Sequence, residues 1–335
     1  MQTKDLARPL SIGSVALPNR VFLAPMSGIS DRPMREIAAG FGAGMVVSEM
    51  VASEQLAVAH PETAMRAERA GPGPHVIQLA GRDPAWMAEG ARAAADAGAD
   101  IIDINMGCPA KKVTNGYAGS ALMRDLGLAL RLIEATVGAT PLPVTLKMRL
   151  GWDHASLNAV NLARKAEQAG IRLITVHGRT RCQFYTGAAD WAAIRVVKEA
   201  VSIPIIANGD CLSLADVARM LELSGADGVM VGRGACGRPW LPGHIAAFAA
   251  SGTLPAAPSG AALGDLVIAH YEAMLAQYGP LVGLRAARKH LGWYIDAAPD
   301  ADRSLRAAIM TESRPAEVVR LLSACFAGTL ARRAA

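Results

Sequence analysis

Short apolar runs alternate with alanine-rich segments of helical periodicity along most of the chain. Eight of these runs lack the alternation of apolar and polar positions that a strand with one solvated face would show. They cover residues 21–24, 45–47, 76–79, 101–104, 144–147, 173–176, 204–207 and 228–231. We expect each run to form a strand that is buried on both faces, as in a parallel sheet covered by helices.

The segments between these runs show the periodicity and the end signals of helices. Residues 84–97 and 155–169 are examples, and Ala-Gly or Ser-Gly ends three segments, at 97–98, 169–170 and 224–225. Glycine in the left-handed conformation commonly ends a helix. Eight strands that alternate with helices through short connections predict an α/β chain with a (β/α)8 TIM barrel rather than an open sheet.

The pattern changes after residue 250. Residues 251–264 are rich in Pro, Ala, Gly and Ser, which predicts a linker. Beyond them, amphipathic helical stretches cover 265–278, 284–295 and 315–330. We therefore predict a barrel domain over 1–250 and, after the linker, a small helical domain over 265–335.

Composition and charge exclude several classes of protein. Hydrophobic residues form 52% of the 335 residues and charged residues 19%, so the chain can build a core and is not intrinsically disordered. The net charge of +5 suits an anionic partner but is too small for a structural DNA-coating protein. The five cysteines include no CxxC pair, so we expect no zinc ribbon, no disulfide framework and no metal site.

We expect a cytoplasmic protein without a membrane span. The first residues lack the apolar segment of a secretory signal. Residues 239–264 carry no charged side chain, but Pro242, Pro255 and Pro258 make this stretch a poor membrane helix.

Polar and ionisable residues stand at the end of nearly every predicted strand. In barrels of this kind, the carboxyl ends of the strands form the functional site. These strand ends include Pro25, Met26, Gln78, Asn105, Cys108, Lys147, His177, Asn208 and Arg233. A barrel with only a structural role would not need these groups, so we predict an active site.

The loops after the seventh and eighth strands suit a phosphate. They read Asn208-Gly209-Asp210 and Gly232-Arg233-Gly234. Glycine lets backbone N–H groups approach an anion, and Arg233 adds a charge-assisted contact. Either loop alone could be an ordinary glycine turn, but the two together favour a phosphate-bearing ligand.

Three strand-end side chains each allow two interpretations. An unpaired ammonium is costly to bury, so Lys147 should form a Schiff base or hold positive charge against an electron-rich cofactor ring. Gln78 could contact the pyrimidine edge of a flavin or be a hydrogen-bonded core amide. His177 could donate to a ring or a phosphate, or bond to backbone.

Cys108 lies after the fourth strand, between Gly107 and Pro109. A cysteine is usually a small buried hydrophobe, but this loop lies on the predicted catalytic face. A nucleophile and a general acid are both open, and an acid would need a pKa near or above neutral.

Five segments resemble the tRNA-dihydrouridine synthase family, and most closely its bacterial B-type branch. They are LAPMSGISDRP at 23–33, NMGCPAKKV at 105–113, VHGRTR at 176–181, ANGD at 207–210 and RKH at 288–290. The similarity runs from about residue 12 to about residue 295. Ser27, Ser30 and Met34 depart from the family pattern, and none of them is a proposed catalytic group.

The resemblance implies a flavoenzyme that uses FMN and NADPH to reduce the C5–C6 double bond of tRNA uridines. NADPH rather than NADH rests on the family alone. The implied contacts to the FMN ring are Pro25, Met26, Ser27, Gln78, Lys147 and His177, and those to its phosphate are Asn208, Gly209, Asp210, Gly232 and Arg233. Lys147 would then stabilise negative charge on the reduced flavin, which leaves the Schiff base a minor alternative.

The family role of Cys108 is that of the general acid. Hydride passes from the reduced flavin to C6 of a flipped-out uracil while the thiol protonates C5. The implied contacts to substrate and tRNA are Asn105, Lys111, Lys112, Arg181, Arg285, Arg288, Lys289 and His290. Without the family match, the last four would be a solvated basic face beside a core aromatic pair; with it, we expect a face that contacts phosphates.

Two other functions stay open at this point. One is an FMN-dependent reductase of a small-molecule enone or pyrimidine. The other is a non-catalytic RNA-binding protein that keeps the barrel as a scaffold. The basic helical domain and Cys108 argue against the first, and Gln78, Cys108 and Lys147 argue against the second.

Overall fold

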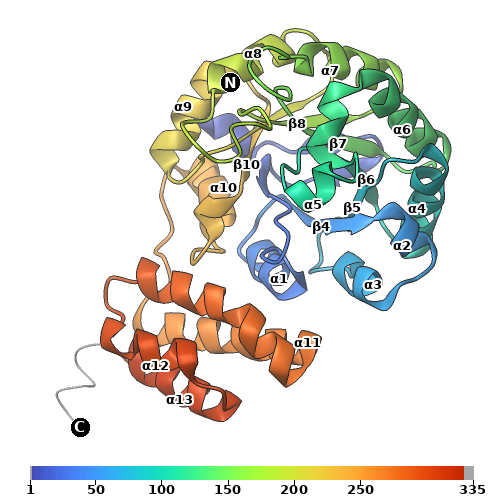
Figure 1. Cartoon of the computed structure of the whole chain (residues 1–335). Helices are drawn as coiled ribbons and strands as arrows, with labels where there is room; N and C mark the ends of the chain where they lie inside the picture. Colours follow the sequence, from blue (N-terminus) through green and yellow to red (C-terminus); the bar gives the residue numbers. More distant parts are fainter. Residues whose placement is uncertain (1, 328–335) are drawn as a thin grey trace. The chain divides into compact units, whose positions relative to one another are not determined.

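The computed structural model describes residues 2–327, which form two compact units (Figure 1). The first unit is built from the chain up to Gly234 together with Pro242–Leu254. The second is built from Ala235–Leu241 and the chain from Pro255 onward. The region around residue 240 therefore contributes to both units, and helix α10 (Leu241–Ser251) belongs almost wholly to the first.

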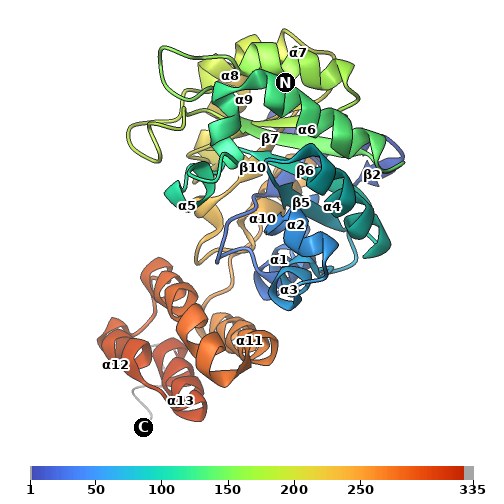
Figure 2. The ribbon, with the colours of Figure 1, turned by 45° about the vertical axis from the view of Figure 1, so that its right-hand side comes forward.

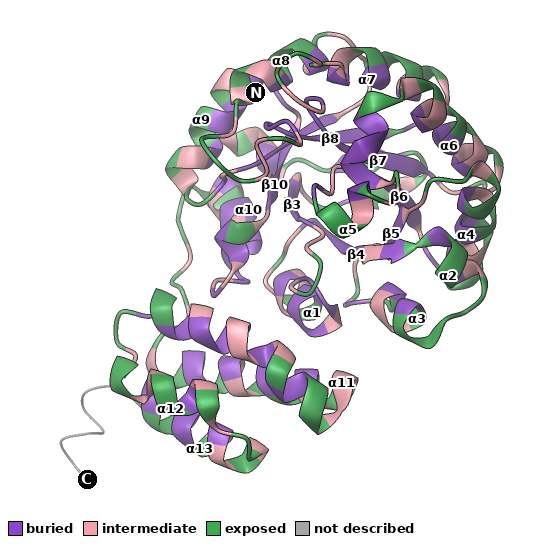
Figure 3. Cartoon of the chain, in the orientation of Figure 1, coloured by how far each residue is buried: buried purple, intermediate pink, exposed green. Residues whose placement is uncertain are grey.

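Eight parallel strands close into a barrel in the first unit. They are β3 (Val21–Leu23), β4 (Met45–Ala52), β5 (Val76–Ala80), β6 (Ile101–Met106), β7 (Val144–Arg149), β8 (Leu173–His177), β9 (Ile205–Asn208) and β10 (Gly228–Val231). The strands pair in chain order, and β10 pairs with β3 to complete the ring. They are buried along nearly their whole length (Figure 3). All eight predicted strands and the predicted barrel are confirmed.

Helices follow the strands, and most of them surround the barrel (Figure 2). They are α1 (Arg32–Gly40), α2 (Ser53–Ala57), α3 (Pro61–Ala67), α4 (Pro84–Asp96), α5 (Lys111–Thr114), α6 (Leu126–Gly138), α7 (Ala159–Gln168), α8 (Trp191–Lys198) and α9 (Leu214–Ser224), with 3₁₀ turns η1 (Thr3–Ala7), η2 (Gly119–Arg124) and η3 (Arg233–Ala235). Gly225 ends α9 at a φ of +63°, as its Ser-Gly sequence predicts. The helix expected from residue 155 begins at Ala159, because Asp153 bonds the Ala155 N–H and the Ser156 hydroxyl in a turn.

A short hairpin, β1 (Leu10–Ile12) and β2 (Val15–Leu17), covers the end of the barrel where the strands begin. Its buried side chains Leu10, Ile12 and Leu17 belong to one core cluster with first residues of barrel strands, such as Val76 and Ile101. This hairpin was not predicted from the sequence. It fills the amino-terminal end of the barrel, so the polar strand ends lie at the opposite mouth.

The second unit is helical. It contains α11 (Gly260–Ala297), η4 (Arg303–Leu305), α12 (Arg306–Thr311) and α13 (Pro315–Phe326). The two helices predicted over 265–278 and 284–295 are the halves of α11, which breaks at Gly279, with a φ of +74°, directly before Pro280. The predicted linker is extended only in part, since α11 already begins at Gly260. The end of the helix predicted over 315–330 lies outside the described residues.

Across residues 2–327, none of the helices combines the length and the apolar character needed to cross a lipid bilayer.

Candidate active site

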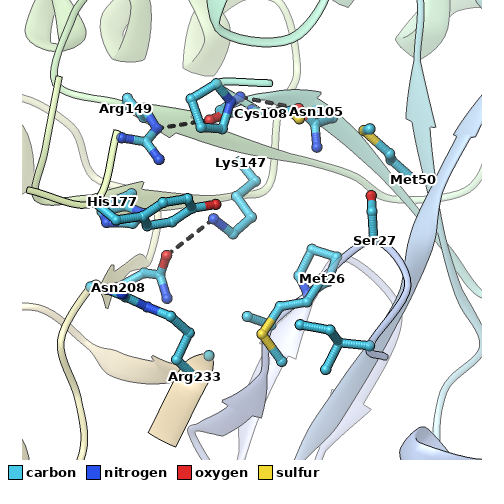
Figure 4. A pocket seen from close by; sticks show the side chains of 18 of the residues that line it. Met26, Ser27, Met50, Asn105, Cys108, Lys147, Arg149, His177, Asn208 and Arg233 are labelled. Atoms are coloured by element: carbon cyan, nitrogen blue, oxygen red, sulfur yellow. Dashed lines mark hydrogen bonds between the residues drawn. The ribbon is translucent and has the colours of Figure 1, made fainter. Parts of the chain in front are cut away.

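A cavity of about 430 Å³ opens at the carboxyl ends of the barrel strands. It brings together the predicted strand-end residues Pro25, Met26, Ser27, Gln78, Asn105, Cys108, Lys147, His177, Asn208, Gly209, Asp210, Gly232 and Arg233. In Figure 4, Asn105 and Cys108 line one border of the cavity and Met26 and Arg233 line another, while the Lys147 side chain extends between them. Residues that are widely separated in the chain therefore share one site, as the barrel topology predicts.

Lys147 projects from the middle of β7 into this cavity and is buried. Its Nζ donates to Asn208 Oδ1 at 3.1 Å, and Asn208 is itself fixed by a bond from its Nδ2 to the Met230 carbonyl at 2.8 Å. The pKa of Lys147 is lowered to about 8, mainly by burial and then by the charge of Arg149, while Asp103 opposes the shift. At neutral pH the side chain is an ammonium that is poorly solvated and faces a ligand-sized space.

The loop that carries Cys108 is held from both sides. Asn105 Oδ1 accepts from the Cys108 N–H at 3.0 Å, and the Ser120 hydroxyl donates to the Cys108 carbonyl at 2.8 Å. Arg149 Nε donates to the Gly107 carbonyl at 2.8 Å. Burial raises the pKa of the Cys108 thiol above its ordinary value, although Arg149 and Lys147 oppose this. The thiol therefore keeps its proton at neutral pH, which favours an acid over a nucleophile.

The two glycine-containing loops meet at the carboxylate of Asp210, whose negative charge is balanced by arginines. Gly209 has a φ of +110°, and a Cβ there would lie 2.9 Å from the His177 ring, so only glycine fits. The next residue, Asp210, receives Arg179 Nη1 at 2.9 Å and Arg233 Nη2 at 3.0 Å. Burial would raise the pKa of Asp210, but these arginines and the Ala189 N–H lower it overall. Its charge is thus balanced, and this end of the cavity remains open to an anion.

His177 is a neutral imidazole in this setting. Burial lowers its pKa well below the ordinary value, and the charges of Lys147 and Arg149 lower it further. Its Nε2 lies 3.4 Å from Arg179 Nη1, which can only donate. The ring proton is therefore on Nδ1.

Gln78 has protein partners at both ends of its amide. Its Nε2 donates to Asp103 Oδ2 at 2.6 Å, and its Oε1 accepts from Asn105 Nδ2 at 2.7 Å. One N–H of the amide remains for a ligand, because an NH₂ group has two donors. The two interpretations of Gln78, a core amide and a ligand contact, are compatible.

Three residues of this site were not assigned a role from the sequence. Arg149 lies two residues after Lys147 on β7, so strand periodicity would have placed both on the same face. Arg179 is buried beside Asp210, and only its position just after β8 hinted at this. Tyr185 lies on a loop with its ring 4.8 Å from the guanidinium carbon of Arg233, and no sequence signal indicates that contact.

The basic residues expected to contact tRNA have different surroundings. Lys111 and Lys112 are exposed on α5. Arg181 is part-buried, with its guanidinium 4.6 Å from the Trp152 ring centre and 4.5 Å from that of Phe184. In the helical unit Arg285 is exposed, while Arg288 and Lys289 are part-buried.

His290 corrects the sequence analysis. It is only 2% exposed, and its ring packs edge-on against His270 and Trp293. Burial, followed by the effects of His270 and Lys289, lowers the pKa of His290 well below its ordinary value. It is a neutral core residue of the helical unit, not a member of a basic surface.

Comparison with known proteins gives one consistent family. The family model described as dihydrouridine synthase (Dus) matches residues 22–330. The probable tRNA-dihydrouridine synthase of Rhizobium leguminosarum bv. phaseoli is 55% identical over 323 residues, covering 96% of this chain and 100% of that protein. The tRNA-dihydrouridine synthase B of Pseudomonas putida is 47% identical over 289 residues, covering 86% of this chain and 86% of that protein.

The similarity to a solved structure concerns the fold alone. Histamine dehydrogenase from Rhizobium sp. 4-9 aligns with a TM-score of 0.57 at 15% identity, covering 81% of this chain and 51% of that chain. The family model and the curated relatives, in contrast, span most of the chain at high identity. The chain therefore belongs to the dihydrouridine synthase family.

Proposed function

We propose that this chain is a tRNA-dihydrouridine synthase, an oxidoreductase that reduces the C5–C6 double bond of uridines in tRNA. The observation that carries the proposal is that the part-buried thiol of Cys108, whose pKa burial raises, shares a cavity with the ammonium of Lys147. A proton donor and a fixed positive charge are what the addition of a proton and a hydride across a polarised double bond requires. Family membership supplies the identity of that double bond.

The cofactor we propose is FMN, with NADPH as its reductant. The cavity has a size usual for sites of small organic ligands. Within the described residues Lys147 uses one of its three donors, on Asn208, so two remain for a ring oxygen or nitrogen. Lys147, Arg149, Arg179 and Arg233 make the site electropositive. These residues therefore fit an electron-rich ring with a phosphate.

The proposed contacts follow the lining of the cavity. Pro25, Met26 and Ser27 would line one edge of the ring, with Gln78, Lys147 and His177 at its polar part. The phosphate would lie against Asn208, Gly209, Asp210, Gly232 and Arg233, with backbone N–H groups and the Arg233 guanidinium as donors, while the Asp210 carboxylate holds Arg233 in place. A bound, reduced flavin supplies the hydride for C6.

Cys108 performs the complementary step. Its Sγ–H bond breaks as the proton goes to C5 of the uracil, and the resulting thiolate recovers a proton from solvent. Arg149 and Lys147 stabilise that thiolate for as long as it exists. Asn105 fixes the Cys108 backbone and retains one amide N–H for the base.

The uracil reaches this cavity only when it is flipped out of the tRNA fold. Lys111, Lys112 and Arg181 near the mouth would bind the phosphates around it, and Arg285, Arg288 and Lys289 of the helical unit would bind other phosphates of the tRNA. His290 is left out of this set because it is buried.

An absorbance spectrum followed under anaerobic NADPH tests the proposal. We expect a flavin spectrum that bleaches with NADPH and then reoxidises faster with tRNA lacking dihydrouridine than with buffer. A bound flavin that ignores tRNA would instead indicate a small-molecule reductase. Protein that neither contains nor takes up FMN would contradict the catalytic proposal as a whole.

A further inference from the structure

A buried carboxylate lies in the barrel one layer below Lys147. Asp103 is the middle residue of a row across three neighbouring strands, in register with Gln78 on β5 and Thr145 on β7. Its Oδ2 accepts from Gln78 Nε2 and its Oδ1 from Thr145 Oγ1, both at 2.6 Å. The residue is 5% exposed and has no role in the function proposed above.

The hydrogen bonds from Asp103 to the Cys108 loop have a fixed direction. Burial raises the pKa of Asp103, while the hydrogen bonds from Gln78 and Thr145 and the charge of Lys147 oppose this. As a carboxylate Asp103 only accepts, so Gln78 turns its NH₂ group toward it. Its Oε1 then faces Asn105 and accepts from Nδ2 at 2.7 Å. This leaves Asn105 Oδ1 to accept from the N–H groups of Gly107 and Cys108, at 3.2 and 3.0 Å.

The order of these bonds matters because both amides could otherwise flip. A reversed Gln78 would present its NH₂ to the NH₂ of Asn105, and a reversed Asn105 would present donors to the two donors of the loop. Arg149 and Ser120 hold only the carbonyl groups of Gly107 and Cys108. The N–H side of the loop therefore depends on the orientation of Asn105.

We propose that Asp103 is a positioning residue, whose carboxylate sets the orientation of the Gln78 and Asn105 amides and thereby fixes the loop that carries Cys108. This inference rests on the proposed function only for the importance of Cys108; the arrangement itself is independent of any ligand. A buried carboxylate that merely satisfied two donors would not affect a loop three hydrogen bonds away.

Two neutral replacements of Asp103 distinguish its role as a hydrogen-bond acceptor from the effect of its negative charge. Asp103→Asn and Asp103→Leu both remove the negative charge that raises the pKa of Lys147. Asn can still accept from Gln78 through Oδ1 while its NH₂ donates to the Thr145 hydroxyl, whereas Leu can do neither. Thr145→Val is the matched control, because it removes the other donor to the same carboxylate and leaves the Gln78 bond intact.

The measurement is amide hydrogen exchange at Gly107 and Cys108, resolved by mass spectrometry on the protein without NADPH or tRNA. We expect exchange about tenfold faster in Asp103→Leu and unchanged in Asp103→Asn and Thr145→Val. Exchange at the β9 amides reports any general loosening of the barrel. Wild-type exchange in Asp103→Leu, or equal acceleration in the Asn and Leu variants, would overturn the proposal.

Gln78→Met keeps the test decisive if Asp103→Leu does not fold. It removes both hydrogen bonds that Gln78 contributes to the same path and leaves Asp103 bonded to Thr145. We expect the same local acceleration at Gly107 and Cys108, and unchanged exchange there would refute the proposal. Because no turnover is measured, failure of uridine reduction and failure of this positioning role remain distinguishable.

Discussion

The barrel mouth and the helical unit both bury titratable groups, and the mouth also keeps a buried amine charged. At the mouth, Lys147 keeps a pKa of about 8 because the negative charge of Asp103 partly offsets burial. In the helical unit, burial and then Lys289 lower the pKa of His270 to about 4, and no carboxylate of residues 2–327 opposes the shift. The ring Nε2 atoms of His270 and His290 have no partner among the described residues.

The barrel mouth is a site that must hold charged groups, whereas the core of the helical unit only has to pack. A buried charge survives where an opposite charge or several hydrogen bonds accompany it. Without them the group becomes neutral, as the two histidines do. Burial of a titratable residue is therefore a weak indicator of a functional site. An opposite charge beside the buried residue is a better indicator.

Removing the proton donor at the mouth should have the largest effect. We expect Cys108→Ala to lower the single-turnover rate of uridine reduction by roughly 10²–10⁴-fold, because a positioned general acid is lost. Flavin content and its reduction by NADPH should be unchanged, as measured by absorbance. Full activity in this variant would exclude the acid role.

Removing the charge at the mouth should have the next largest effect. We expect Lys147→Met to slow uridine reduction roughly 10²-fold, as the loss of one preorganised donor usually does. The wild-type rate should fall as pH rises through about 8, since the ammonium loses its proton there. The variant should lack that decline, and a decline retained in Lys147→Met would assign it to another group.

Acid should destabilise the helical unit. His270 binds a proton more weakly in the folded state, with a pKa of about 4, than in the unfolded state. Stability is therefore lost as pH falls from about 6.5 toward 4, by about 2 kcal/mol at pH 5 for this residue alone. Denaturant melts between pH 5 and 7, followed by helical circular dichroism, would measure it. His270→Gln should flatten the dependence, and an equally steep curve in that variant would argue against this source.

Surface charge on the helical unit should have the smallest effect. We expect Arg288→Ala combined with Lys289→Ala to weaken tRNA binding about tenfold and to reduce the slope of log affinity against log salt by about two. NADPH oxidation without tRNA should not change. Arg320→Ala is a matched control, since that exposed arginine is paired with Glu317 on α13. An unaltered slope would mean that these cations do not face phosphates.

The barrel could be read from the sequence because each of its strands is buried on both faces and so forms an uninterrupted apolar run. The strand-end residues followed from the same reading, since parallel strands bring their carboxyl ends together. The hairpin of β1 and β2 was missed because three-residue strands leave almost no periodicity. The partners of Arg179 and Tyr185 lie on other loops, and spacing along one segment does not encode them.

His290 shows the same limit within a helix. Arg285, Arg288 and Lys289 have the spacing of one helical face, but the next residue lies about 100° further round. That position turns His290 toward His270, which lies in the other half of α11. The chain reverses between them, and only the folded unit reveals which face is covered.

Closure of the barrel also determines when the edges of its sheet become paired during translation. One edge of β3 pairs with β10, which is synthesised roughly 200 residues later. At common rates of translation this delay is about 10–40 s. During that interval the edge of β3 is unpaired. The last barrel strand to emerge is thus the one that removes both open edges of the sheet at once.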